Sequence, residues 1–207
     1  LTLGGATAFW ESLAFGFVQR RARHYRFGEF STKFAAVTAR APWLDEPNLV
    51  DAEPGARPKL SEAPGCDVQA LTHNETSTGV MQDIVRVDDA LVVVDATSAA
   101  GGIAIDLEAV DVYYFSLQKG FASDGGLTVA IVSPAAIERI GQLSASARYV
   151  PTFLDLQTAL DNTRKDQTYN TPAVATIFLA AEQITWMLER FGNLDGVVAT
   201  QQRKAEL

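Results

Sequence analysis

Side chains that can do chemistry gather in three short stretches of the sequence, each directly after an apolar, strand-like run. The stretches are residues 73–79, 95–98 and 116–120. A strand often ends in polar turn residues, so one stretch of this kind predicts little by itself. Because ligands of an open α/β sheet bind outside the carboxyl ends of its strands, three such stretches together predict one shared site.

Three features of the sequence match three chemical groups of a single cofactor. Asp95 is an acid at one strand end, Lys119 is an amine at a neighbouring strand end, and Gly4-Gly5 is a turn that opens a helix. Pyridoxal phosphate has an aldehyde that needs a lysine, a ring nitrogen that needs a carboxylate, and a phosphate that suits free N–H groups at a helix start. The combination therefore favours pyridoxal phosphate as the cofactor.

Helix-like and strand-like segments alternate along the chain and must position these groups. A helix opens after Gly5, with Phe9, Leu13 and Phe17 at roughly helical spacing. The other predicted helices cover residues 29–39, 134–143, 156–164 and 171–190, the last with Pro172 in its first turn. The predicted strands cover residues 24–27, 67–71, 91–94, 111–115 and 127–132. This alternation indicates an α/β fold, a three-layer sandwich with a mostly parallel central sheet flanked by helices.

The composition narrows the class of protein. The 207 residues carry 17 basic and 25 acidic side chains, a formal net charge of −8, which argues against a nucleic-acid partner. No apolar run approaches the roughly 20 residues of a membrane span, so no membrane partner is expected. The single cysteine, Cys66, can form no internal disulfide, which fits a cytoplasmic location. Two isolated histidines, His24 and His73, predict no metal site.

Five ordered blocks of the sequence resemble the phosphoserine aminotransferase family, and most closely its actinobacterial branch. The blocks are residues 4–10 (GGATAFW), 25–31 (YRFGEFS), 72–80 (THNETSTGV), 95–98 with 113–127 (DATS and YYFSLQKGFASDGGL), and 167–173 (QTYNTPA). Their order, and their span across nearly the whole chain, argue against a chance match. This family belongs to the class V, fold-type I aminotransferases, which depend on pyridoxal 5'-phosphate.

The resemblance implies roles for four residues around the cofactor ring. Lys119 corresponds to the Schiff-base lysine, which also serves as the general base for proton transfer. Asp95 corresponds to the acid beside the pyridine nitrogen, and Thr76 to a hydroxyl that bonds the ring's phenolic oxygen. Phe30 stands where other branches of the family stack a tryptophan on the ring, and a phenylalanine can still stack there.

The resemblance also implies five contacts to the cofactor phosphate. Ala6 and Thr7 correspond to backbone N–H contacts at a helix start, and Gln118 to a side-chain contact. Asn170 and Thr171 correspond to contacts that come from the other subunit, which implies a homodimer with shared active sites. The remaining aromatic candidates are interpreted as packing residues: Trp10, Trp43 and Trp186.

Complete members of the family begin with a further N-terminal segment and end in a smaller C-terminal domain. We expect residues 1–207 to be the pyridoxal-phosphate-binding large domain alone, without those two parts. The side chains that grip the substrate belong to those parts in the family. The sequence therefore predicts the cofactor site and leaves the substrate-binding residues outside it.

The activity implied by the resemblance is phosphoserine transamination in serine biosynthesis. Glutamate and 3-phosphohydroxypyruvate would give 2-oxoglutarate and 3-phosphoserine by a ping-pong mechanism. One alternative is another enzyme of the same fold, an alanine–glyoxylate-type aminotransferase or a cysteine desulfurase, although Cys66 lies away from the motif blocks. The other alternative is a non-catalytic, cofactor-free interaction domain, against which the presence of both Lys119 and Asp95 argues.

Overall fold

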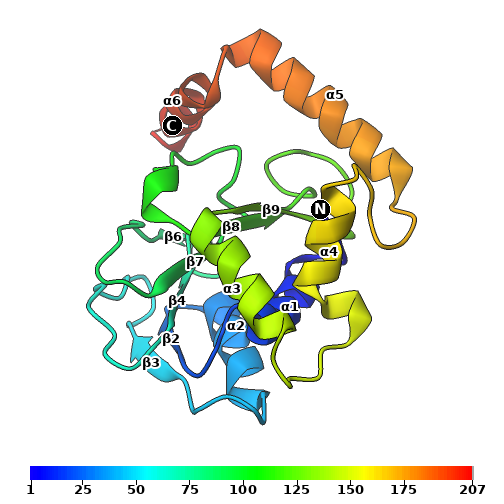
Figure 1. The fold of residues 1–207 in the computed structure, drawn as a ribbon. Helices are drawn as coiled ribbons and strands as arrows, with labels where there is room; N and C mark the ends of the chain where they lie inside the picture. The colour runs from blue at the N-terminus through cyan, green and yellow to red at the C-terminus, as the bar shows by residue number, and fades with distance from the viewer. Residues whose placement is uncertain (207) are drawn as a thin grey trace.

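The computed structural model describes residues 1–206 and is built on one seven-stranded sheet of order β1-β9-β8-β7-β4-β2-β3 (Figure 1). Its strands are β1 (Thr2–Leu3), β2 (Ala22–Arg26), β3 (Asn48–Asp51), β4 (Val68–Thr72), β7 (Leu91–Asp95), β8 (Val112–Ser116) and β9 (Leu127–Val132). The five strands from β3 to β8 in this order run parallel, whereas β9 is antiparallel to β8 and β1 is antiparallel to β9. The predicted mostly parallel α/β sheet is confirmed.

The helices are α1 (Ala6–Gly16), α2 (Glu29–Arg40), α3 (Pro134–Ser144), α4 (Leu156–Thr163), α5 (Val174–Phe191) and α6 (Leu194–Ala205). Side chains of α1, α2 and α3 share one hydrophobic cluster with the sheet. In Figure 1, α5 and α6 lie at the top of the view, above β8 and β9. Within residues 1–206, no helix has the length and apolar character needed to cross a membrane.

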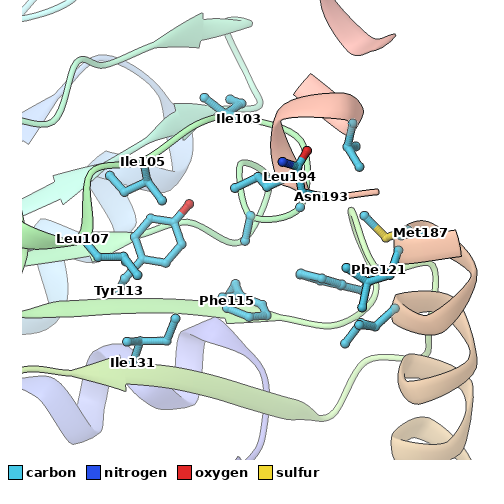
Figure 2. A pocket seen from close by; sticks show the side chains of 15 residues that line it. Ile103, Ile105, Leu107, Tyr113, Phe115, Phe121, Ile131, Met187, Asn193 and Leu194 are labelled. Atoms are coloured by element: carbon cyan, nitrogen blue, oxygen red, sulfur yellow. The ribbon is translucent and has the colours of Figure 1, made fainter. Parts of the chain in front are cut away.

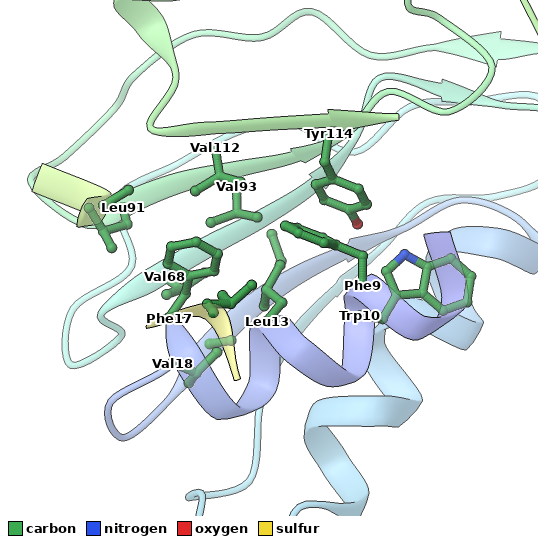
Figure 3. Packing of buried hydrophobic residues seen from close by; sticks show 14 of the residues in the cluster. Phe9, Trp10, Leu13, Phe17, Val18, Val68, Leu91, Val93, Val112 and Tyr114 are labelled. Carbon is green, nitrogen blue, oxygen red and sulfur yellow. The ribbon is translucent and has the colours of Figure 1, made fainter. Parts of the chain in front are cut away.

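The central strands are apolar throughout because both of their faces are covered. Along β7, Val93 belongs to the cluster on the α1 face, whereas Val92 and Val94 belong to the cluster on the opposite face. On the α1 face, the rings of Phe9 and Tyr114 pack with their centroids 4.4 Å apart (Figure 3). This packing fixes α1 across β7 and β8, with its first turn at the carboxyl ends of those strands.

The opposite face of the sheet carries an apolar hollow of about 270 Å³ between β8, β9 and the two C-terminal helices (Figure 2). Phe115 from β8 and Ile131 from β9 form its floor, and Met187 from α5 and Leu194 from α6 form part of its wall. Several large apolar side chains of α5 also remain exposed, among them Phe178 and Trp186. This hollow carries none of the residues predicted to bind a cofactor.

Four of the five predicted strands lie within one residue of the observed ones, and the fifth, β2, begins at Ala22, two residues before its predicted start. The loop predicted at residues 53–64 is also observed. The prediction lacks β1, β3, the α6 helix and the short hairpin of β5 (Asn74–Glu75) and β6 (Val80–Met81). The α5 helix begins at Val174 rather than residue 171, so Pro172 precedes it. A proline disfavours the helical conformation in the residue before it, which keeps Thr171 outside the helix.

Candidate active site

A hollow of about 200 Å³ lies at the carboxyl ends of β4, β7 and β8, next to the first turn of α1. We refer to it as the strand-end pocket. It is lined by Gly5, Ala6, Thr7, Trp10, Phe30, Thr72, Asn74, Thr76, Asp95, Thr97, Ser98, Gln118 and Lys119. The structure therefore brings together seven of the predicted site residues: Ala6, Thr7, Phe30, Thr76, Asp95, Gln118 and Lys119.

The first turn of α1 presents free backbone N–H groups to the strand-end pocket. The helix begins after Gly5 without a side-chain cap, and Ala6 and Thr7 both line the pocket. Gly4 has a φ of +89°, and a Cβ there would lie 2.6 Å from the Cβ of Ala8, so only glycine fits this turn. Its N–H donates to the carbonyl of Gly126 at 2.8 Å, which anchors the turn to the start of β9. An uncapped helix start of this kind suits an anion.

Asp95 ends β7 and is almost completely buried, with 5% of its surface exposed. The backbone N–H of Thr97 donates to its Oδ1 at 2.9 Å, and the indole Nε1 of Trp10 donates to its Oδ2 at 2.8 Å. Burial raises the pKa of Asp95 above its usual value, although the hydrogen bonds from Thr97 and Trp10 act in the opposite direction. The pKa of this buried carboxyl group is thus set by burial, which raises it, against the hydrogen bonds around it, which lower it.

Trp10 is a site residue that the sequence interpretation assigned to packing alone. It packs against Phe34, with ring centroids 5.7 Å apart, but it also lines the strand-end pocket and bonds to Asp95. A signal for this placement exists in the sequence. Trp10 follows Ala6 by four residues and Thr7 by three, which puts all three on one face of α1.

Lys119 lies in the turn after β8 and is exposed, and its amine forms no ion pair within residues 1–206. The turn closes through a hydrogen bond from the Ala122 N–H to the Lys119 carbonyl at 3.0 Å. Ala122 adopts a φ of +47°, which is uncommon for a residue with a Cβ. The Ser123 hydroxyl donates to the carbonyl of Thr176 in α5 at 2.7 Å, so this turn is tied to α5.

Glu75 joins the two segments that carry Phe30 and Thr76, and the sequence interpretation did not single it out. Its carboxylate is fully buried and accepts hydrogen bonds at 2.8 Å from the Ser31 N–H, the Ser31 hydroxyl and the Ser77 hydroxyl. The Phe30 N–H adds a longer contact of 3.3 Å. Burial alone would raise the pKa of Glu75, but these hydrogen bonds outweigh it and lower the pKa below its usual value. The carboxylate therefore caps α2 as an ion.

Asn170 and Thr171 do not lie in the strand-end pocket. Both are exposed, and they line a separate hollow of about 570 Å³ together with Thr168, Tyr169 and Pro172. Within this segment the Thr168 hydroxyl donates to the Asn170 carbonyl at 2.6 Å. Within one chain, Asn170 and Thr171 therefore line a different hollow from the other residues predicted to contact the phosphate.

Three comparisons place this chain among known proteins. Residues 53–207 match the family model described as aminotransferase class-V. Phosphoserine aminotransferases from Nocardioides sp. and Corynebacterium glutamicum are 56% and 54% identical to it over 201 and 202 residues. These alignments cover 95% and 96% of this chain but 54% of each of those proteins. The chain therefore spans about half the length of the curated relatives it matches.

Solved structures show the same fold. A phosphoserine aminotransferase from Cytophaga hutchinsonii superposes with a TM-score of 0.91 at 28% identity, over 99% of this chain and 58% of that one. An alanine–glyoxylate aminotransferase from Nostoc sp. superposes with a TM-score of 0.81 over 100% of this chain and 57% of that one. Its 20% identity carries the likeness of fold and nothing more.

Proposed function

The chain belongs to the class-V aminotransferase family, and we propose that its strand-end pocket binds pyridoxal 5'-phosphate as part of a phosphoserine aminotransferase. One observation carries the proposal: a lysine amine, a buried carboxylate and an uncapped helix start line the same hollow. The reaction proposed for the whole protein is amino transfer between glutamate and 3-phosphohydroxypyruvate, which gives 2-oxoglutarate and 3-phosphoserine. Its first support is the similarity to the phosphoserine aminotransferases of Nocardioides sp. and Corynebacterium glutamicum.

The pocket residues fit the chemical groups of this cofactor. Asp95 is a buried anion that suits a protonated ring nitrogen, and the N–H groups of Ala6 and Thr7 suit a phosphate. Phe30 offers an aromatic face, and Lys119 offers an amine. When bound, pyridoxal phosphate supplies an aldehyde that bonds to an amine and a ring that withdraws electrons from the substrate's α-carbon.

Each residue then has a defined task. Lys119 would hold the cofactor through its aldehyde group, and the Lys119 amine would carry a proton at the substrate's α-carbon. Asp95 would keep the ring nitrogen protonated, and the Thr76 hydroxyl would donate to the phenolic oxygen. The Gln118 side chain adds a contact to the phosphate. From the stretches 73–79 and 95–98, Asn74, Thr76, Asp95, Thr97 and Ser98 line the pocket.

We also propose that the functional unit is a homodimer with shared sites, in which Asn170 and Thr171 of one chain contact the phosphate held by the other. Their exposure and their distance from the strand-end pocket support this arrangement. In this proposal residues 1–207 form one cofactor-binding large domain, and the protein works in the cytoplasm. The partners are small-molecule substrates and a second copy of the chain.

A covalent trapping experiment tests the cofactor assignment. The chain is incubated with pyridoxal phosphate, reduced with borohydride to make any lysine–cofactor bond permanent, and mapped by peptide mass spectrometry. We expect one dominant adduct on Lys119, which Lys119→Ala abolishes. Lys33→Ala is the matched control, because Lys33 is an exposed lysine paired with Glu29 outside the pocket. Adducts spread over surface lysines, and unchanged by Lys119→Ala, would refute the proposal.

A further inference from the structure

The carboxylate of Asp95 is held by one hydrogen-bond donor on each oxygen. The backbone N–H of Thr97 occupies Oδ1, and the indole N–H of Trp10, 85 residues away in sequence, occupies Oδ2. Trp10 and Asp95 are both buried, with 4% and 5% of their surface exposed. The Thr97 N–H belongs to the backbone and is present whatever the side chain, so within residues 1–206 Trp10 provides the well-aligned side-chain hydrogen bond to Asp95.

The direction of the indole N–H is fixed by packing. The Trp10 ring stacks on Phe34 with an interplanar angle of 18°, and α1 holds it beside the strand-end pocket. An indole nitrogen only donates and carries no ionisable proton near neutral pH. Its hydrogen bond therefore favours the carboxylate form of Asp95, because a protonated oxygen at Oδ2 would point its own hydrogen at the donor.

The hydroxyls of Thr97 and Tyr114 also lower the pKa of Asp95, but neither forms a well-aligned hydrogen bond within residues 1–206. Tyr113 and Tyr114 approach from β8, and the Tyr114 hydroxyl is buried without a well-aligned hydrogen-bond partner in residues 1–206. Burial raises the pKa of both tyrosines, and it lowers the pKa of His73, which follows β4, to about 4. These three groups are uncharged at neutral pH. Lys119, across the pocket, is a basic side chain and is exposed.

We propose that Trp10 is a positioning residue for Asp95, whose indole N–H holds the carboxylate ionised and aimed into the strand-end pocket. The identity of the group that Asp95 then meets, a protonated pyridine nitrogen, rests on the function proposed above. A carboxylate that kept its own proton could not pair with such a ring. Trp10 therefore acts on the cofactor through Asp95 rather than by contact with the reacting atoms.

The decisive readout is the titration of Asp95 in the cofactor-free chain. Carbon-13 NMR of the aspartate carboxyls follows it, with Asp95→Asn to assign the signal. We expect Trp10→Phe to raise the pKa of Asp95 by about one unit, or ~1.4 kcal/mol, because the charged form loses a donor. Trp43→Phe is the matched control, since Trp43 stacks on Phe15 outside the pocket. It should leave the titration unchanged.

A second variant removes the donor without changing the shape of the side chain. Benzothienylalanine at position 10 replaces the indole N–H by sulfur and keeps the ring volume, so it serves if Trp10→Phe unfolds. We expect the same rise in pKa, together with pyridoxal phosphate binding about tenfold weaker than in the wild type, as measured by absorbance titration.

Two outcomes separate the two proposals. An Asp95 titration that neither variant changes, or that Trp43→Phe changes equally, overturns the role of Trp10. A wild-type chain that binds no pyridoxal phosphate overturns the proposed function, while a raised pKa in both Trp10 variants still supports Trp10 as the residue that controls the Asp95 charge.

Discussion

Replacing Glu75 with glutamine removes one charge from the buried contact between α2 and the β5–β6 hairpin. In the native protein Oε2 accepts from the N–H and hydroxyl of Ser31, and Oε1 accepts from the Ser77 hydroxyl and more distantly from the N–H groups of Phe30 and Ser77. A glutamine amide has one oxygen and one NH₂ group. Either orientation therefore points an NH₂ donor at a backbone N–H donor.

The size of the effect follows from these contacts. A hydrogen bond to a charged group contributes about 1.5–3 kcal/mol, and a buried donor left without an acceptor costs about 1–3 kcal/mol. Since glutamine keeps one good acceptor and loses the other, we expect Glu75→Gln to lower the free energy of unfolding by about 3 kcal/mol. For a domain of this length, that corresponds to a fall of roughly 6–12 °C in Tm.

The contribution of Glu75 to stability also depends on pH, which provides a second test. The folded-state pKa of Glu75 is depressed, so its contribution is complete above the unfolded value of about 4.3 and is lost as the pH falls through the lower folded value. The difference in Tm between wild type and Glu75→Gln should therefore narrow on acidification. Other carboxyl groups affect both proteins alike and cancel in this difference.

Thermal unfolding followed by circular dichroism between pH 7 and pH 3 measures both effects. Glu29→Gln is the matched control, because Glu29 also lies in the first turn of α2 but is exposed and pairs only with Lys33. Such a surface pair contributes about 0–1 kcal/mol, so its loss should change Tm little. A Glu75→Gln protein that melts within about 2 °C of the wild type at pH 7, or a difference that stays constant down to pH 3, would refute the argument.

Two further predictions concern the proposed active site. Asp95→Asn should still bind cofactor but slow amino transfer by the full-length protein on the order of a thousandfold, or ~4 kcal/mol at about 1.4 kcal/mol per factor of ten; a near-normal rate in single-turnover kinetics would remove Asp95 from this role. Mixing Lys119→Ala chains with chains that carry Asn170→Ala and Thr171→Ala should restore one intact cofactor site per mixed dimer, measured as recovered tight cofactor binding. No recovery despite demonstrated subunit exchange would place the pair outside the shared site.

Much of the fold could be predicted because its central strands are continuous apolar runs, such as residues 91–94, between polar turns. The same rule located most of the site, since parallel strands that end in polar stretches bring those stretches to one edge. The missed strand β3 is a four-residue edge strand with alternating exposure, too short to stand out from the surrounding loop. The missed helix α6 buries only Val197, so its sequence carries little helical periodicity.

The contacts that organise the site could not be predicted in the same way. Trp10 meets Asp95 across 85 residues, and Glu75 meets Ser31 across 44. Spacing within a segment indicates which face of a helix or strand a side chain occupies, but it carries no information about which distant side chain lies opposite. The sequence therefore shows Glu75 as part of a polar stretch. Its role as the cap of α2 depends on which residues lie opposite it in the folded chain.

The anchoring of Gly4 on Gly126 has a thermodynamic consequence for the first turn of α1. The strand that leads into this turn, β1, has two residues, lies at the end of the sheet and pairs with β9 alone, through Thr2 opposite Thr128 and Leu3 opposite Leu127. Such short edges open at a low free-energy cost, well below that of global unfolding. A molecule in which this edge has frayed no longer holds the helix start in place.

The affinity for an anion at that turn is therefore the intrinsic affinity multiplied by the fraction of molecules with the edge formed. A bound anion shifts the same equilibrium toward the formed edge, because it binds that state and not the frayed one. The binding of an anion at the helix start and the local order of residues 2–4 are therefore thermodynamically linked. The stability of the two-residue strand β1 sets the fraction of molecules with the edge formed. The sequence of β1 therefore changes the affinity for the anion, although β1 does not contact it.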